Sequence, residues 1–149
     1  MTGVTIFAYS DVLHLVNAAV GGRGGYNFSG KNLSGANLSL TNLIQADFRQ
    51  ANLTGAFLSG ADLSFANFSW ANLSEANLVR TNLRMAYLRY AYLSGADLFR
   101  ANLTMADLRN ADLTEAYLDE VNLRAAKYNH ATKWPEDFDF RRSYAIYVD

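Results

Sequence analysis

The chain has 149 residues, of which 50% are hydrophobic and 18% charged, and its formal net charge is −1. This length is sufficient for one domain, and the balanced charge argues against a nonspecific nucleic-acid binder and against a heavily acidic surface. The absence of Cys excludes disulfides and thiolate metal sites. No Lys or Arg precedes Arg23, and Asp11, His14 and Asn17 interrupt the apolar start, so we predict neither a signal peptide nor a membrane-spanning helix. We therefore expect a cytoplasmic protein without membrane association.

Residues 1–25 are predicted to form an N-terminal capping segment. Apolar residues recur at helical spacing over residues 12–20, after Ser10, whose hydroxyl suits a helix N-cap. Glycines within residues 21–25 end the helix and provide a flexible hinge. We expect this helix to cover one end of the repeat structure that follows.

Residues 26–125 consist of twenty consecutive five-residue blocks that share one pattern. Each block has a small residue, a polar residue, a large apolar residue and two variable residues, as in Ala71–Glu75 (ANLSE) and Ala106–Asn110 (ADLRN). The first position is Ala in 15 blocks, and the central position is Leu in 17 and Phe in three. A helix repeats near 3.6 residues and a strand repeats at 2, so neither gives a strict period of five. Each block is therefore predicted to make a short extended segment with the small and large apolar side chains inward, followed by a turn whose residues, such as Ser64, point outward.

Blocks that cannot bury their own apolar side must stack on one another, which predicts an all-β solenoid. The three central Phe residues, Phe28, Phe48 and Phe68, are spaced by 20 residues. Four blocks in each coil would stack these Phe rings along one side. Twenty blocks then give about five coils, spaced like paired strands at about 4.8 Å.

After Ala125 the pattern becomes less regular, and we place the end of the repeat domain at residues 26–130. Residues 131–149 are predicted to form a folded C-terminal cap, because many aromatic residues occur in this short stretch. They are Trp134, Phe138, Phe140, Tyr144 and Tyr147.

The blocks resemble those of the pentapeptide-repeat family, whose pattern is A(D/N)LXX, and the C-terminal TKWPEDFD stretch is similar to cyanobacterial members. The resemblance implies a right-handed quadrilateral β-helix. It also implies two kinds of function, because the family includes proteins that protect DNA gyrase from quinolones as acidic mimics of duplex DNA, and many others with regulatory or unassigned roles.

Motifs for chemistry are absent or incomplete. Gly25–Lys31 resembles the start of a P-loop, but Asn32 occupies the position of the Mg²⁺-binding Ser or Thr and a repeat strand follows instead of a helix. Both His residues lie outside the blocks, and the nearby acids, such as Asp107 with Asp112, occupy outward polar positions. We therefore expect no catalytic, cofactor-binding or metal site, no small-molecule substrate and no enzyme activity.

Winding the chain at 20 residues per coil gathers large outward residues that are scattered in the linear sequence. We call them the aromatic patch; they are Phe65, Trp70, Met85, Tyr87, Arg89, Tyr90, Tyr92 and Met105. Aromatic residues, Met and Arg are enriched at the centres of protein interfaces. The alternative is that these side chains only pack along the β surface.

Two functions remain open from the sequence. The preferred hypothesis is a non-enzymatic protein-interaction or scaffold module that binds a protein partner or itself, without direct nucleic-acid binding. The alternative is a DNA-mimicking modulator of DNA gyrase. A mimic needs a dense negative stripe, whereas residues 26–125 contain nine Asp or Glu and eight Lys or Arg.

Overall fold

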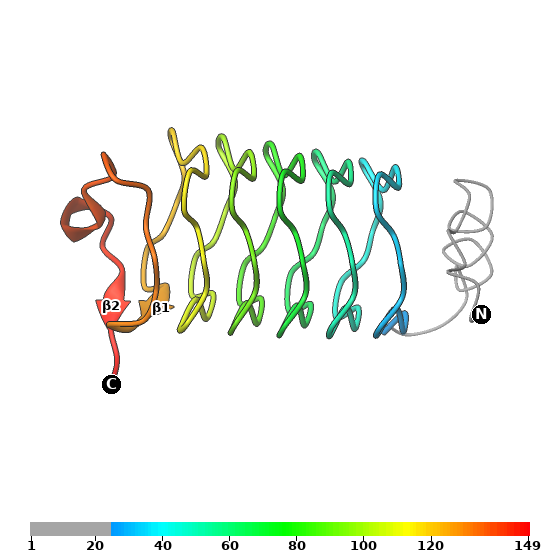
Figure 1. Ribbon diagram of the computed structural model, residues 1–149, viewed down its shortest axis with the longest axis horizontal. Coiled ribbons are helices and arrows are strands. Elements are labelled where there is room, and N and C mark those ends of the chain that lie inside the picture. Colours follow the sequence, from blue (N-terminus) through cyan, green and yellow to red (C-terminus); the bar gives the residue numbers. More distant parts are fainter. Residues whose placement is uncertain (1–24) are drawn as a thin grey trace.

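The computed structural model describes residues 25–149, so the predicted N-terminal helix and nearly all of the Gly-rich hinge lie outside the described residues. The described chain winds into a solenoid whose coils stack along the long axis of the molecule (Figure 1). The repeat blocks contribute isolated bridges, and the named elements are β1 (Lys127–Tyr128), the 3-10 helix η1 (Phe140–Arg142) and β2 (Ile146–Tyr147).

The coil has a period of 20 residues, as the Phe spacing predicts. Parallel bridges join the polar positions of successive coils, from Asn27 with Asp47 to Asp107 with Lys127. The rings of Phe28 and Phe48 stack at 4.9 Å between centroids, and those of Phe48 and Phe68 stack at 4.8 Å. The predicted lengthwise Phe stack is therefore confirmed.

Backbone hydrogen bonds run between coils in both directions. The Leu78 amide donates to the Asp97 carbonyl of the next coil at 2.7 Å, and the Asn77 amide donates to the Ala56 carbonyl of the previous coil at 2.9 Å. This pairing satisfies backbone groups that would otherwise be costly to bury inside a stacked structure.

The last residue of every block, from Gly30 to Ala125, has a left-handed φ between 54° and 67°. The amide of the next block donates back to the central residue, as Thr81 does to Leu78 at 3.1 Å, so the two variable residues form a turn with the geometry expected of type II. Five of these twenty residues are Gly, and the other fifteen adopt the conformation despite a Cβ cost of about 1–2 kcal/mol. The left-handed conformation is therefore a property of the fold and does not by itself mark a site.

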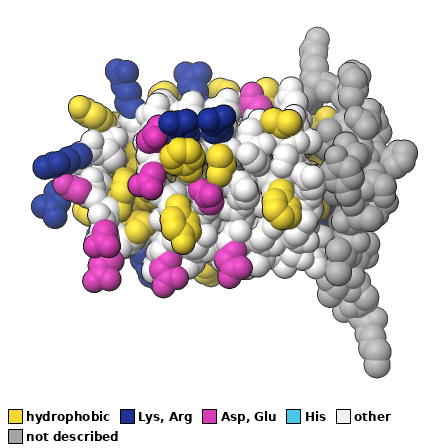
Figure 2. Space-filling view, turned by 90° about the horizontal axis from the view of Figure 1, so that it is seen from above, with side chains coloured by type: hydrophobic (Ala, Val, Ile, Leu, Met, Phe, Trp, Pro, Cys, Tyr) yellow, Lys and Arg dark blue, Asp and Glu magenta, His cyan; other side chains and the backbone are white. Residues whose placement is uncertain are grey.

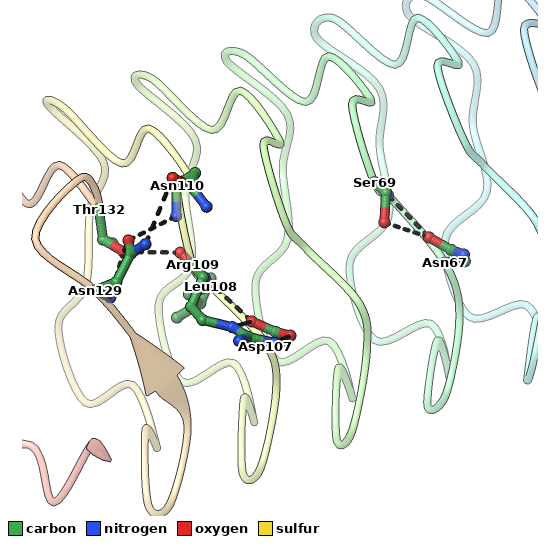
Figure 3. Close-up of polar contacts among 8 residues, drawn as sticks. All are labelled: Asn67, Ser69, Asp107, Leu108, Arg109, Asn110, Asn129 and Thr132. Atoms are coloured by element: carbon green, nitrogen blue, oxygen red, sulfur yellow. Dashed lines mark hydrogen bonds and ion pairs between the residues drawn. The ribbon is translucent and has the colours of Figure 1, made fainter. Parts of the chain in front are cut away.

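The preference for Asn or Asp at the polar position has a local cause. In sixteen blocks its side-chain oxygen accepts a hydrogen bond from the amide two residues later, as Asn67 does from Ser69 at 3.0 Å and Asp107 from Arg109 at 3.2 Å (Figure 3). This Asx interaction pairs an amide for which the backbone provides no acceptor. The four blocks without it carry an aromatic residue at the polar position: Phe57, Tyr87, Tyr92 and Tyr117.

The interior follows the predicted pattern, since the central Leu and Phe and all 15 first-position Ala residues are buried. Thr81 replaces Ala at a fully buried first position and donates its hydroxyl to the Leu58 carbonyl at 2.9 Å. One outward assignment is wrong. Ser64 is 7% exposed, because this small residue lies between the larger Ile44 and Arg84 at the equivalent positions of the adjacent coils.

The C-terminal residues continue the coil with one extra residue. Asp112 bridges Lys133, 21 positions later, where the other bridges span 20. β2 then pairs in parallel with β1 beyond the last regular coil (Figure 1). Tyr128 contacts several aromatic rings edge-on, among them Trp134 at 5.8 Å and Phe140 at 5.4 Å. The aromatic residues of the tail thus pack together, except for Tyr144, which is 82% exposed, and their capping role stays a prediction.

Candidate interaction surface

The aromatic patch occupies one side of the solenoid and the two corners that flank it, and Tyr92 extends it onto the following side. One coil contributes five outward residues in a row: Met85, Tyr87, Arg89, Tyr90 and Tyr92. The preceding coil adds Phe65 and Trp70, and the following coil adds Met105. Each of these residues has solvent access.

Exposure differs among the patch residues. Trp70, Tyr87 and Tyr92 are each 52% exposed, whereas Met85 and Arg89 are half-buried. Tyr87 and Tyr92 each form β-bridges with a shorter residue of the preceding coil and a shorter residue of the following coil. Their rings therefore project above a surface of smaller polar side chains.

Trp70 and Tyr90 form a stacked pair across two coils. They occupy the same turn position 20 residues apart, and their rings lie 4.1 Å apart and nearly parallel, at 3°. The Arg89 guanidinium carbon lies 5.7 Å from the centroid of the Tyr90 ring. Stacking and the left-handed backbone, with φ of 64° at Trp70 and 59° at Tyr90, hold this pair in a defined position.

Three Arg residues share one outward column on this side: Arg49, Arg89 and Arg109. Arg49 pairs with Asp47 at 2.6 Å, and Arg109 pairs with Asp107 at 2.6 Å (Figure 3). In both cases the Asp occupies the polar position of the same block, two residues before the Arg.

These ion pairs perturb the carboxyl groups. The Arg49 side-chain hydrogen bond lowers the pKa of Asp47. At Asp107 burial is the largest effect and raises the pKa, but the hydrogen bonds from Arg109 and its backbone amide outweigh it, and the pKa lies below its ordinary value. The balance at Asp112 is similar: burial raises its pKa, and hydrogen bonds from Lys133 and Thr114 lower it further than burial raises it. These three aspartates are therefore ionised and already paired.

A second set of exposed apolar residues, outside the aromatic patch, lies on the opposite side of the solenoid. It includes Leu40, 84% exposed, Phe57, 51% exposed, and Tyr117, 65% exposed. Phe57 and Tyr117 are three coils apart, so these residues are dispersed. Figure 2 shows one face on which hydrophobic side chains lie among both basic and acidic ones. Aligning the sequence at 20 residues per coil places these residues at outward positions, so the sequence alone could have identified this set.

Other kinds of site find little support in the part of the chain that the structure describes. Residues 25–149 contain no group of three or more His, Cys, Asp or Glu placed to hold a metal ion. An open hollow of about 180 Å³ lies at the C-terminal end, between the Tyr117 block and the stretch from Pro135 to Phe138. No helix within the described residues has the length and apolar character needed to cross a bilayer.

Comparison with known proteins identifies the repeat. The family described as Pentapeptide repeats matches in eight copies, over residues 32–64, 66–104 and 91–127. No match was found among curated proteins.

Solved structures give the same result. The pentapeptide-repeat protein Rfr23 from the cyanobacterium Cyanothece 51142 is 32% identical over 72% of this chain and 90% of its own, with a TM-score of 0.64. The pentapeptide-repeat protein alr5209 from Nostoc Pcc 7120 is also 32% identical, over 92% of this chain and 95% of its own, with a TM-score of 0.56. A trypsin-treated form of QnrB1, a plasmid-mediated fluoroquinolone resistance protein, is 19% identical over 83% of this chain and 67% of its own; its TM-score of 0.67 shows a shared fold alone. These neighbours imply a right-handed β-helix solenoid.

Proposed function

The chain belongs to the pentapeptide-repeat family, and from that premise we propose that it is a non-enzymatic protein-interaction or scaffold module. Its rigid β-helical surface presents the aromatic patch to a protein. The proposal concerns the patch as a binding surface, with no chemistry performed on the bound molecule.

The observation that carries the proposal is the unbroken row of large outward side chains across one coil, from Met85 to Tyr92. Two members of this row, Tyr87 and Tyr92, occupy positions where Asn or Asp would form the Asx hydrogen bond, and each remains 52% exposed. Each block thus lacks a hydrogen bond worth about 0.5–1.5 kcal/mol, while about half of each ring stays in contact with solvent. Binding provides a reason for retaining both rings. On the opposite side, Phe57 and Tyr117 are isolated from each other by Asn77 and Asp97.

The DNA-mimic alternative is less well supported. A mimic displays unneutralised negative charge at a spacing similar to that of phosphates. On the side bearing the patch and the side that follows it, Asp47, Asp107 and Asp112 are each paired with a Lys or Arg. A gyrase supercoiling assay with a quinolone tests this alternative, and we expect no protection.

The proposal includes the finer organisation of the chain. The repeat domain, residues 26–130, comprises about five coils, followed by an aromatic cap in residues 131–149. The packing of Tyr128 against Trp134 and Phe140 supports the cap. This cap would prevent end-to-end pairing of exposed backbone groups at the C-terminal end. The cytoplasmic location also stays a prediction.

A paired-variant experiment tests the function. The change Trp70→Asn with Tyr90→Asn removes the stacked rings and retains a residue that tolerates a left-handed φ, as Asn110 does in the same column with φ of 62°. The matched control is Phe57→Asn with Tyr117→Asn, which removes two exposed rings from the opposite side, where Asn37 and Asn77 occupy equivalent positions.

We expect both double variants to keep the circular dichroism spectrum of the wild type. Only the first should lose association, measured by light scattering for self-association and by crosslinking to bound proteins for a separate partner. Truncation at an interface hot spot costs about 2 kcal/mol or more. Equal association by both variants would show that the patch is only surface packing.

A further inference from the structure

We propose that the aromatic patch recognises a carboxylate side chain on an extended protein segment, and that Arg89 is the residue that binds it. This inference rests on the proposed function, since it specifies the chemistry of the partner at the same surface. It follows from a comparison of Arg89 with the two other Arg residues in its column.

Arg89 lacks the carboxylate that its column neighbours have. Arg49 and Arg109 follow Asp two residues earlier, in the blocks ADFRQ and ADLRN, and each forms a bidentate pair with that Asp. The block of Arg89 reads AYLRY, so Tyr87 stands where the Asp would be. Among the residues that the structure describes, Arg89 forms no ion pair and no side-chain hydrogen bond, and its Nε atom is buried without a partner. Its backbone amide also lacks the Asx acceptor.

The surroundings of Arg89 strengthen its attraction for an anion. The guanidinium lies beside the Tyr90 ring, which stacks on Trp70, and Tyr87 occupies the preceding outward position. A binding segment that covers these rings would exclude water from the guanidinium. Charge-assisted hydrogen bonds strengthen in such a low-dielectric setting, and the planar guanidinium matches a carboxylate in bidentate geometry. Rings next to the charge favour an acidic residue that is followed or preceded by an apolar one.

The nearby charges select the occupant. Asp107 is in the next coil, where its carboxylate is held by Arg109 and also interacts with the charge of Arg89. These three groups carry a net charge of +1, which suits one carboxylate. A nucleic-acid backbone would bring many phosphates close to Asp107 and Asp112, so it is disfavoured. A symmetric contact between two copies of the chain through this face is disfavoured too, because its paired aspartates already have cationic partners.

The test begins with a selection from phage-displayed random peptides on the immobilised full-length protein. We expect the enriched peptides to carry Asp or Glu beside an aromatic or aliphatic residue. One such peptide is then synthesised with Glu and with Gln at the acidic position, and the affinities are measured by fluorescence anisotropy. The wild-type protein should prefer the Glu peptide by about ten- to a hundredfold, the range expected of a desolvated charge-assisted pair.

Variants at three positions isolate the effect of the Arg89 charge. Arg89→Gln should abolish the Glu preference, and Arg84→Gln, an exposed Arg at the same position of the preceding block, should retain it. Tyr87→Asp recreates the Asp and Arg pair of the neighbouring coils within the block, so it should also abolish the preference. Tyr87→Asn removes the same ring without supplying a charge, so it should weaken both peptides and retain the preference.

Several outcomes would overturn the inference. Enriched peptides without an acidic residue would do so, as would a Glu preference that survives Arg89→Gln or Tyr87→Asp. Self-association of the protein that is lost in Arg89→Gln, or binding of a labelled oligonucleotide that requires Arg89, would do so too. If peptides lack acids but still require Trp70 and Tyr90, the inference fails and the proposed function stands. If no selected peptide requires Trp70 or Tyr90, both fail. Unchanged thermal melting of Arg89→Gln confirms that it folds, as expected for a side chain without hydrogen bonds.

Discussion

The stability of the solenoid should depend strongly on single central Leu residues, and Leu83→Ala tests this directly. Leu83 is fully buried, with Leu63 and Leu103 at the same position of the adjacent coils, also fully buried. The spacing of these coils is fixed by backbone hydrogen bonds, such as those from Leu63 to Asn82 and from Leu83 to Asn102, both 2.8 Å. Leu→Ala changes in cores cost about 2–5 kcal/mol, more when the surroundings cannot collapse. Coils held at this spacing cannot close on the cavity, so we expect Leu83→Ala to lower the free energy of unfolding by about 3–5 kcal/mol.

The assay is urea unfolding of Leu83→Ala beside the control Arg84→Ala, which truncates the adjacent exposed side chain and should shift stability by less than about 0.5 kcal/mol. Repeat proteins can unfold in parts. Fluorescence should therefore be followed separately at Trp70, within the coils, and at Trp134, near the C-terminal end, in variants that retain only one of them. Equal losses of stability in the two Ala variants would refute the assignment of the central position to a rigid, closely packed interior.

Two further predictions follow from hydrogen bonds at the polar position. Tyr87→Asn should be more stable than Tyr87→Ala by about 1 kcal/mol in urea unfolding, because only Asn restores the Asx acceptor; equal stability would show that water satisfies the amide equally well. The folded-state pKa of Asp107 is lowered, so its pair with Arg109 contributes stability that is present above the unfolded pKa of about 3.9 and is lost as pH falls through the folded value. The melting temperature of Asp107→Asn should therefore fall less than that of the wild type between about pH 6 and pH 3, and parallel pH profiles would contradict this.

Much of the fold can be read from the sequence because one local rule is repeated. The spacing of Phe28, Phe48 and Phe68 predicts the period of the coil, and the stacked rings confirm it. The burial of Ser64 could not be predicted from its block, because it depends on residues 20 positions away in both directions. The extra residue before Lys133 could not be predicted either, because the repeat pattern provides no rule for it.

The members of the candidate site could be listed from the sequence once the period was known. That Arg89 lacks the carboxylate partner of the other Arg residues in its column could not. Recognising it requires knowing that the polar position and the position two residues later present adjacent side chains, as the pairs Asp47 with Arg49 and Asp107 with Arg109 show. With that geometry, the substitution of Tyr87 for Asp becomes informative. The exposed residues on the opposite side, such as Phe57, lie outside the predicted patch.

The strict coil period also makes chain length a determinant of surface composition. Five residues correspond to a quarter turn around the axis, since the bridges join residues 20 apart. Inserting one block between Trp70 and Tyr90 would leave every block able to fold, yet it would rotate all later coils by 90° and place the two rings on different corners. An insertion of one full coil would restore their alignment but separate them by an additional layer. The surface therefore tolerates point substitutions more readily than changes of length, and functional divergence by insertion should proceed in steps of whole coils at either end of the patch.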